Sequence, residues 1–190
     1  MLVPIAIVAA VFLALSFWLF RTLPGTSGAE GWLAGFFLLA AFSMPLWVWQ
    51  TQDQPVLGDF ESMLVLVSHG LMSAVMCSYT LFIGRMFRPD SSWARWVTAF
   101  LVGVEILAPL ALVFFGGDRD EPHPIVLVVG TACALPFVWG FAETYHDYAR
   151  MKRRVVLGLC DPVVGNRFAL ATIWNGALLV LPIALVPLRS

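Results

Sequence analysis

The chain has 190 residues, of which 60% are hydrophobic and 12% are charged, and its mean hydropathy is +0.86. A soluble domain carries about 25% charged residues, and a soluble core of this size could not bury so much apolar surface, so lipid is expected to be the main solvent. The net charge of −1, without a large basic patch, gives no reason to expect a nucleic-acid partner.

The first apolar run, residues 2–20, is interpreted as a retained membrane helix. No basic residue precedes it and no Ala-x-Ala cleavage pattern follows it, whereas a secretory signal normally has both features. A span needs roughly 20 predominantly apolar residues. Five further stretches meet this requirement: 32–50, 61–84, 96–115, 124–146 and 168–188. The sequence therefore predicts an all-α polytopic transmembrane bundle of six spans, with residues 1–190 forming a single domain.

Basic residues set the predicted orientation, because Lys and Arg stay on the cytoplasmic side of a membrane. Nine of the eleven lie in or beside the connections after the first, third and fifth spans: Arg21, Arg85, Arg88, Arg95, Arg150, Lys152, Arg153, Arg154 and Arg167. The second and fourth connections hold mainly acidic residues. The odd-numbered connections are therefore expected inside, and both termini outside.

Few ionisable residues lie at membrane depth, and each is a functional hypothesis because its burial in lipid is costly. His69 lies 8 residues from Glu61 at the outer end of the third span, and Glu105 lies 10 residues from Phe115 at the outer end of the fourth. At 1.5 Å per residue, both lie roughly 12–15 Å below the outer surface. Helices joined by a short connection pack side by side, so His69 and Glu105 are expected to meet.

The predicted outer-half pocket for a ligand or proton contains five side chains: His69, Ser73, Glu105, Trp174 and Asn175. Ser73 belongs to a polar stripe of the third span, Ser62, His69, Ser73 and Thr80, whose spacings of 7, 4 and 7 place it on one helical face. Asn175 follows Trp174 in the first half of the sixth span. The alternative role for these groups is structural, as helix–helix hydrogen bonds that contribute about 0.6–2 kcal/mol each.

A second polar cluster is predicted at the cytoplasmic end of the fifth span. Four residues share a helical face there with the spacing i, i+3, i+4, i+7: Glu143, His146, Asp147 and Arg150. The connection that follows contributes Asp161, Asn166 and Arg167. Asp161 is expected to begin a turn and Asn166 to cap the sixth helix. We interpret the seven residues as a latch that orders the cytoplasmic face.

The same stripe contains Glu143-x-x-His146, a spacing used in carboxylate-bridged di-metal bundles. Such a centre needs a second Glu-x-x-His at the same level, and the sequence has no second copy. Cys77, Cys133 and Cys160 have no C-x-x-C spacing and predict neither a zinc site nor a disulfide framework. No metal and no cofactor is predicted.

Two segments, FRPDSSWAR (87–95) and LGLCDPVVGNRF (157–168), resemble parts of a family of uncharacterised bacterial multispan membrane proteins. Both lie on the predicted cytoplasmic side. The resemblance implies a six- or seven-helix fold in a bacterial cytoplasmic membrane. It implies no particular activity, and it supplies no catalytic residues.

The predicted function is that of a membrane sensory or ligand-binding protein with an outer pocket and an ordered cytoplasmic face. Its partners are expected to be membrane lipids, with a protein partner or a second copy of the chain as further candidates. The alternatives are a small transporter or channel subunit and an accessory subunit of a larger membrane complex. An enzyme is disfavoured, because no Ser/His/Asp set, metal set or pair of acids at one depth is evident.

Overall fold

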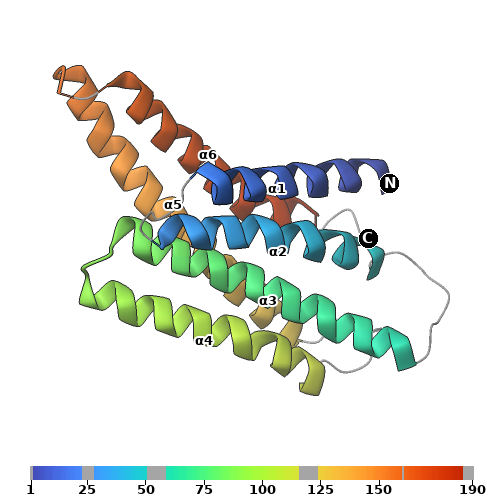
Figure 1. Cartoon of the computed structure of the whole chain (residues 1–190). Helices are drawn as coiled ribbons and strands as arrows, with labels where there is room; N and C mark the ends of the chain where they lie inside the picture. Colours follow the sequence, from blue (N-terminus) through green and yellow to red (C-terminus); the bar gives the residue numbers. More distant parts are fainter. Residues whose placement is uncertain (1, 23–27, 51–58, 116–123, 160, 186–190) are drawn as a thin grey trace. The chain divides into compact units, whose positions relative to one another are not determined.

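The structure, a computed structural model, describes residues 2–22, 28–50, 59–115, 124–159 and 161–185. Every regular element in these ranges is an α-helix (Figure 1): α1 (Leu2–Thr22), α2 (Ala29–Gln50), α3 (Asp59–Phe87), α4 (Ser92–Phe115), α5 (Pro124–Val156) and α6 (Pro162–Leu185). The all-α prediction is confirmed for these residues. The chain divides into two compact units, Met1–Cys133 and Ala134–Ser190, and each unit is described by itself.

Three helices contain stretches that are long and apolar enough to cross a membrane: Leu66–Phe87 in α3, Ser92–Ala111 in α4 and Val163–Val180 in α6. The described parts of α1 and α2 contain shorter apolar segments, Ala6–Leu19 and Gly31–Leu46. Each of the six predicted spans overlaps one helix, and residues 186–188 of the sixth predicted span lie outside the described residues. A crossing by all six helices, and the side on which the termini lie, stay predictions.

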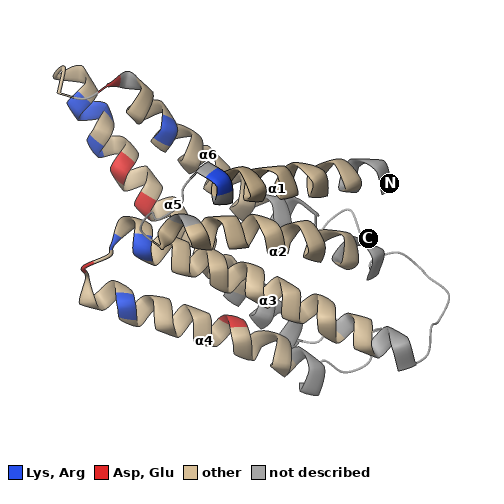
Figure 2. Ribbon diagram, viewed as in Figure 1, with Lys and Arg blue, Asp and Glu red and all other residues tan. Residues whose placement is uncertain are grey.

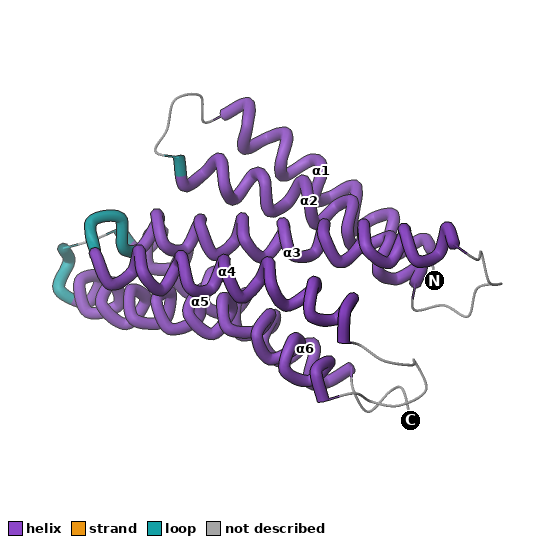
Figure 3. Tube along the Cα trace, turned by 90° about the horizontal axis from the view of Figure 1, so that it is seen from below, coloured by secondary structure: helices purple, strands orange, loops and turns teal. Residues whose placement is uncertain are grey.

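The helices of the first unit pack in chain order (Figures 1 and 3): α2 lies against α1 and α3, and α3 lies against α4. Small residues make the close approaches. Ser16 of α1 donates a hydrogen bond of 3.0 Å to the carbonyl oxygen of Ala34 in α2. A Cβ placed on Gly35 would lie 3.8 Å from Ser78 Oγ of α3, an ordinary contact distance, so these two small residues face each other across the α2–α3 contact.

The described basic residues of the first unit lie at the end where α1 and α3 finish and α4 begins (Figure 2): Arg21, Arg85, Arg88 and Arg95. Two of them lie over indole rings: the Arg85 guanidinium carbon is 5.6 Å from the Trp32 ring centre, and that of Arg88 is 5.9 Å from the Trp93 ring centre. Tryptophan and arginine at one level are typical of a membrane interface. This arrangement fits the predicted orientation, in which these connections face the cytoplasm.

The orientation can be tested by labelling single cysteines in a protein that lacks the three native ones. An impermeant reagent added outside is expected to label a cysteine at Asp120, which lies outside the described residues, and to leave one at Lys152 unlabelled, because basic connections stay inside. The same reagent added after permeabilisation should label both positions and serves as the control. Labelling of position 152 alone from outside would contradict the predicted topology.

The second unit is an antiparallel hairpin formed by the end of α5, from Ala134, and α6. Two α6 glycines set its register. A Cβ on Gly176 would lie 3.4 Å from Phe141 Cε2, and a Cβ on Gly165 would lie 3.5 Å from Val155 Cγ2. Phe141 therefore lies opposite Gly176, and Val155 opposite Gly165.

The connection between α5 and α6 is much shorter than the sequence predicts. The fifth span was expected to end at residue 146, but α5 continues to Val156, because residues 147–156 are mostly good helix formers although five of the ten are charged. Gly158 ends the helix with φ 69°, a conformation that favours glycine. Asp161 caps α6: its Oδ1 accepts a hydrogen bond of 2.8 Å from the Val163 amide. The prediction that Asn166 caps this helix is wrong, because Asn166 lies within α6.

Candidate functional site

The most buried ionisable group among the described residues is Glu105 of α4, whose residue is 1% exposed. Its Oε1 accepts a hydrogen bond of 2.6 Å from the hydroxyl of Thr80, a fully buried residue of α3. The hydroxyl of Ser73, also on α3, donates a hydrogen bond of 2.6 Å to the backbone carbonyl oxygen of Glu105. The Cys77 thiol lies beside the same carboxyl group. We call Ser73, Cys77, Thr80 and Glu105 the α3–α4 polar cluster.

The second carboxyl oxygen of Glu105, Oε2, is buried and has no hydrogen-bond partner in the described part of the chain. Leaving a buried polar atom unpaired costs about 1–3 kcal/mol, and more when the group is charged. The three side chains that contact Glu105 from α3 are all neutral. Cys133, at the end of the first unit, is the residue of α5 within electrostatic range of the carboxyl group. A proton or another small cation would satisfy Oε2.

Thr80 is the hydrogen-bond partner of the Glu105 carboxyl group, where the sequence analysis expected His69. Side chains tilt toward the N-terminus of their own helix. Because α3 and α4 are antiparallel, this tilt takes the Glu105 side chain past Ser73 toward Thr80, and away from His69. His69 is partly exposed. The matched depths of the two backbone positions predict that α3 and α4 pack together and that Ser73 lies near Glu105. They do not predict the direction in which the Glu105 side chain points.

The remaining members of the predicted outer pocket, Trp174 and Asn175, belong to the second unit. Asn175 is buried, and its Nδ2 donates a hydrogen bond of 2.9 Å to the carbonyl oxygen of Ala171 on the same helix. Trp174 is exposed. Because Phe141 lies opposite Gly176, Asn175 lies at the level of Glu143. Within the second unit, Asn175 therefore lies at the same height along the hairpin as Glu143, a residue of the predicted latch.

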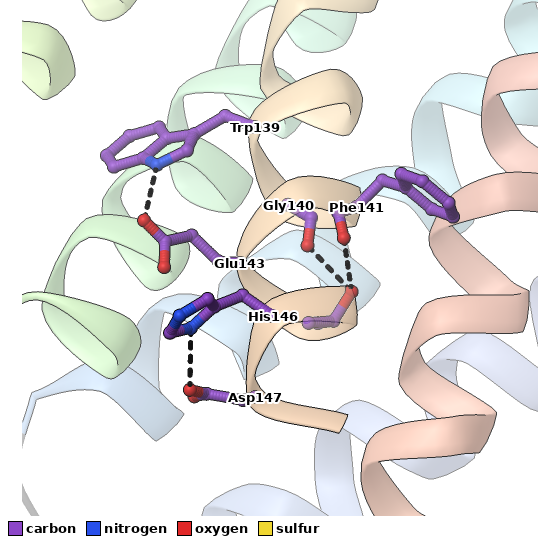
Figure 4. Close-up of polar contacts among 7 residues, drawn as sticks. Trp139, Gly140, Phe141, Glu143, His146 and Asp147 are labelled. Carbon is purple, nitrogen blue, oxygen red and sulfur yellow. Dashed lines mark hydrogen bonds and ion pairs between the residues drawn. The ribbon is translucent and has the colours of Figure 1, made fainter. Parts of the chain in front are cut away.

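Figure 4 shows Glu143, His146 and Asp147 of the polar stripe on α5. Glu143 is buried, and its Oε1 accepts a hydrogen bond of 3.3 Å from the indole nitrogen of Trp139, one turn earlier on the same helix. Thr144 bonds back to the carbonyl oxygens of Gly140 and Phe141 at 2.8 and 3.1 Å. Trp139 is thus one partner of the Glu143 carboxyl group.

His146 and Asp147 lie at the polar end of the same stripe. His146 Nδ1 is 3.5 Å from Asp147 Oδ1, and the histidine side chain is 63% exposed. Arg150, Asn166 and Arg167 are also exposed. The carboxylate of Asp161 is used by the α6 cap. A latch that joins these residues stays a prediction.

Among the residues that the structure describes, no three His, Cys, Asp or Glu side chains come together in a way that could hold a metal ion. Around Glu105 lie two residues of these types, with Cys77 beside the carboxyl group and Cys133 in electrostatic range. The chemistry available at this cluster is therefore hydrogen bonding and the binding of a proton or of a small cation by one carboxyl group.

Comparison of the chain with protein-family models, with curated proteins and with solved structures finds no match.

Proposed function

We propose that this chain is an integral membrane ligand-binding protein of the sensory type, and that Glu105 is the group that receives the ligand. The observation that carries the proposal is the buried, unpartnered Oε2 atom in the α3–α4 polar cluster. A carboxyl group at membrane depth is costly to keep unless it binds something or pairs with something. The ligand is a small cation, of which the proton is the smallest.

Coupling between the helices follows from the same contacts. Thr80 and Ser73 hold the Glu105 side chain and its backbone from two positions on α3. A change of charge at Glu105 alters the strength of the hydrogen bond from Thr80, because bonds to charged groups are stronger than bonds to neutral ones. Ligand binding at Oε2 is therefore expected to shift the packing of α3 against α4, whose connecting turn carries Arg88 and Asp90.

The test is ligand-dependent thermal unfolding of the purified protein in detergent. The wild-type melting temperature is expected to change with pH at constant salt, or with Na⁺ or K⁺ at constant pH, and the two series separate a proton from a metal cation. Glu105→Gln removes the charge with little change in size, so it should abolish the response. Glu143→Gln, which alters the other buried acid, should retain it. A response that persists unchanged in Glu105→Gln would reject Glu105 as the receiving group.

A further inference from the structure

The turn between α5 and α6 exposes large apolar side chains at the polar end of the second unit. Val156, Leu157 and Leu159 are 80%, 69% and 73% exposed. Many of the other exposed apolar side chains lie along the apolar stretches of the helices. These three lie directly after the charged last turns of α5, where water or headgroups are the expected surroundings.

The hydrogen bonds of the turn explain why Leu159 is uncovered. The Leu159 amide donates to the carbonyl oxygen of Arg154 at 2.8 Å, and the Gly158 amide donates to that of Val155 at 3.0 Å. This is the Schellman pattern, in which the residue after the glycine usually packs on an apolar side chain one turn back in the helix. Here the residues at that place are Arg153 and Arg154, so Leu159 has no apolar partner of its own helix to cover it.

Defined backbone features lie on both sides of the turn. Gly158 adopts its positive φ at the start of the turn, and Asp161 caps the next helix with Pro162 at the first helical position. Few residues lie between these two fixed points. The apolar side chains therefore point outward from a short, well-defined end.

Basic side chains surround this apolar end. Between residues 150 and 167 there are five basic residues and one acidic residue, which gives a local net charge of +4: Arg150, Lys152, Arg153, Arg154 and Arg167 against Asp161. The five basic residues are exposed. Exposed apolar side chains next to a cluster of basic side chains are the combination that binds the boundary between acidic headgroups and acyl chains.

The position of the turn relative to a membrane also favours binding to lipid. The apolar stretch of α6 begins at Val163, two residues after the cap residue Asp161. If α6 crosses the bilayer with this stretch, the turn lies within the headgroup layer, which is roughly 5–8 Å thick on each side. The basic side chains on the neighbouring turns of α5 then reach the phosphates by extending along the helix.

We propose that the α5–α6 turn is a binding surface for acidic phospholipid. Leu157 and Leu159 pack among the headgroups, and Lys152, Arg153 and Arg154 extend their side chains along α5 to bind the lipid phosphates. The surface anchors the polar end of the hairpin to the membrane from which the hairpin emerges. This role is independent of Glu105 and of any ligand there.

The test uses the full-length protein with a single cysteine at Leu157, labelled with an environment-sensitive fluorophore, in nanodiscs of phosphatidylcholine alone or mixed with phosphatidylglycerol. Phosphatidylglycerol is expected to shift the emission to the blue and to increase quenching by nitroxide-labelled lipid. The triple variant K152Q/R153Q/R154Q should require a roughly 10- to 100-fold higher effective acidic-lipid density for the same response. High salt should weaken the wild-type response.

The matched control is R85Q/R88Q/R95Q, which makes the same change of charge on the first unit and should leave the response at position 157 intact. Helical content measured by circular dichroism confirms that each variant folds. Equal emission in both lipid compositions, or a full response in K152Q/R153Q/R154Q, would overturn the proposal. A shift that appears only when two copies of the chain share a nanodisc would also overturn it, because a second copy would then cover the turn.

Discussion

Replacing Thr80 by valine is expected to lower the free energy of unfolding by about 1–3 kcal/mol, as measured by unfolding in mixed detergent. Valine has nearly the shape of threonine but lacks the hydroxyl that donates to Glu105 Oε1 at 2.6 Å. Since Oε2 already has no partner in the described part of the chain, the variant leaves the carboxyl group, at 1% exposure, with the weakly donating Cys77 thiol as its neighbour on α3.

Thr98→Val is the matched control on the neighbouring helix. The Thr98 hydroxyl donates to the carbonyl oxygen of Ala94, one turn back in α4, at 2.8 Å. That carbonyl keeps its helical hydrogen bond when the hydroxyl is lost, so a change within about 0.5 kcal/mol is expected. Equal effects of Thr80→Val and Thr98→Val would show that the interhelical bond to Glu105 contributes nothing of its own.

The double variant Thr80→Val, Glu105→Met separates a functional from a structural role for the cluster. Replacing both partners of a buried polar pair by apolar groups of similar size is often neutral or stabilising. The double variant is therefore expected to be close to the wild type in stability, and to have lost the response to protons or cations. A stable but unresponsive protein is the result expected of a carboxyl group kept for function. A strongly destabilised double variant would assign Glu105 a structural role.

The helices were predictable from apolar runs, but their ends were not. A membrane span is recognised by its apolar residues, so the predicted fifth span ends where the charged residues of α5 begin. Five of the ten residues 147–156 of α5 are charged, yet Ala, Met, Lys and Arg favour helix, so the helix continues through them toward the glycine that adopts positive φ. The motif Gly158-x-x-Asp161-Pro162 contains the signals for both the end of α5 and the start of α6. Reading these signals would have corrected the expected cap at Asn166.

The candidate site was predictable in part. The polar stripe of α3 and the depth of Glu105 identified the helices and the contact with Ser73. Depth alone could not choose between His69 and Thr80 as the partner of the carboxyl group, because both lie on the same stripe, on either side of Ser73. The direction of the side chain along its helix makes the choice. The unpartnered state of Oε2 follows from the packing around it, which no spacing of residues in the sequence encodes.

The second large expected effect concerns the hairpin of the second unit. Gly176→Leu is expected to lower its stability by about 1–3 kcal/mol, because added carbons overpack the contact between α5 and α6. The first added atom, Cβ, would already lie 3.4 Å from Phe141 Cε2 and 3.6 Å from Cδ2. The remaining carbons of leucine must then displace the ring. Limited proteolysis within the α5–α6 turn, together with thermal unfolding, measures the loosening.

Gly103→Leu provides the control on α4, because a Cβ at Gly103 meets nothing within 4 Å. Leucine favours helix over glycine, so this variant should be unchanged or up to about 1 kcal/mol more stable. Combining Gly176→Leu with Phe141→Ala exchanges the large and small partners and should recover much of the loss. Recovery would establish that Phe141 and Gly176 lie face to face, and with them that Glu143 and Asn175 share one level of the hairpin. Equal destabilisation by the single and double variants would refute this register.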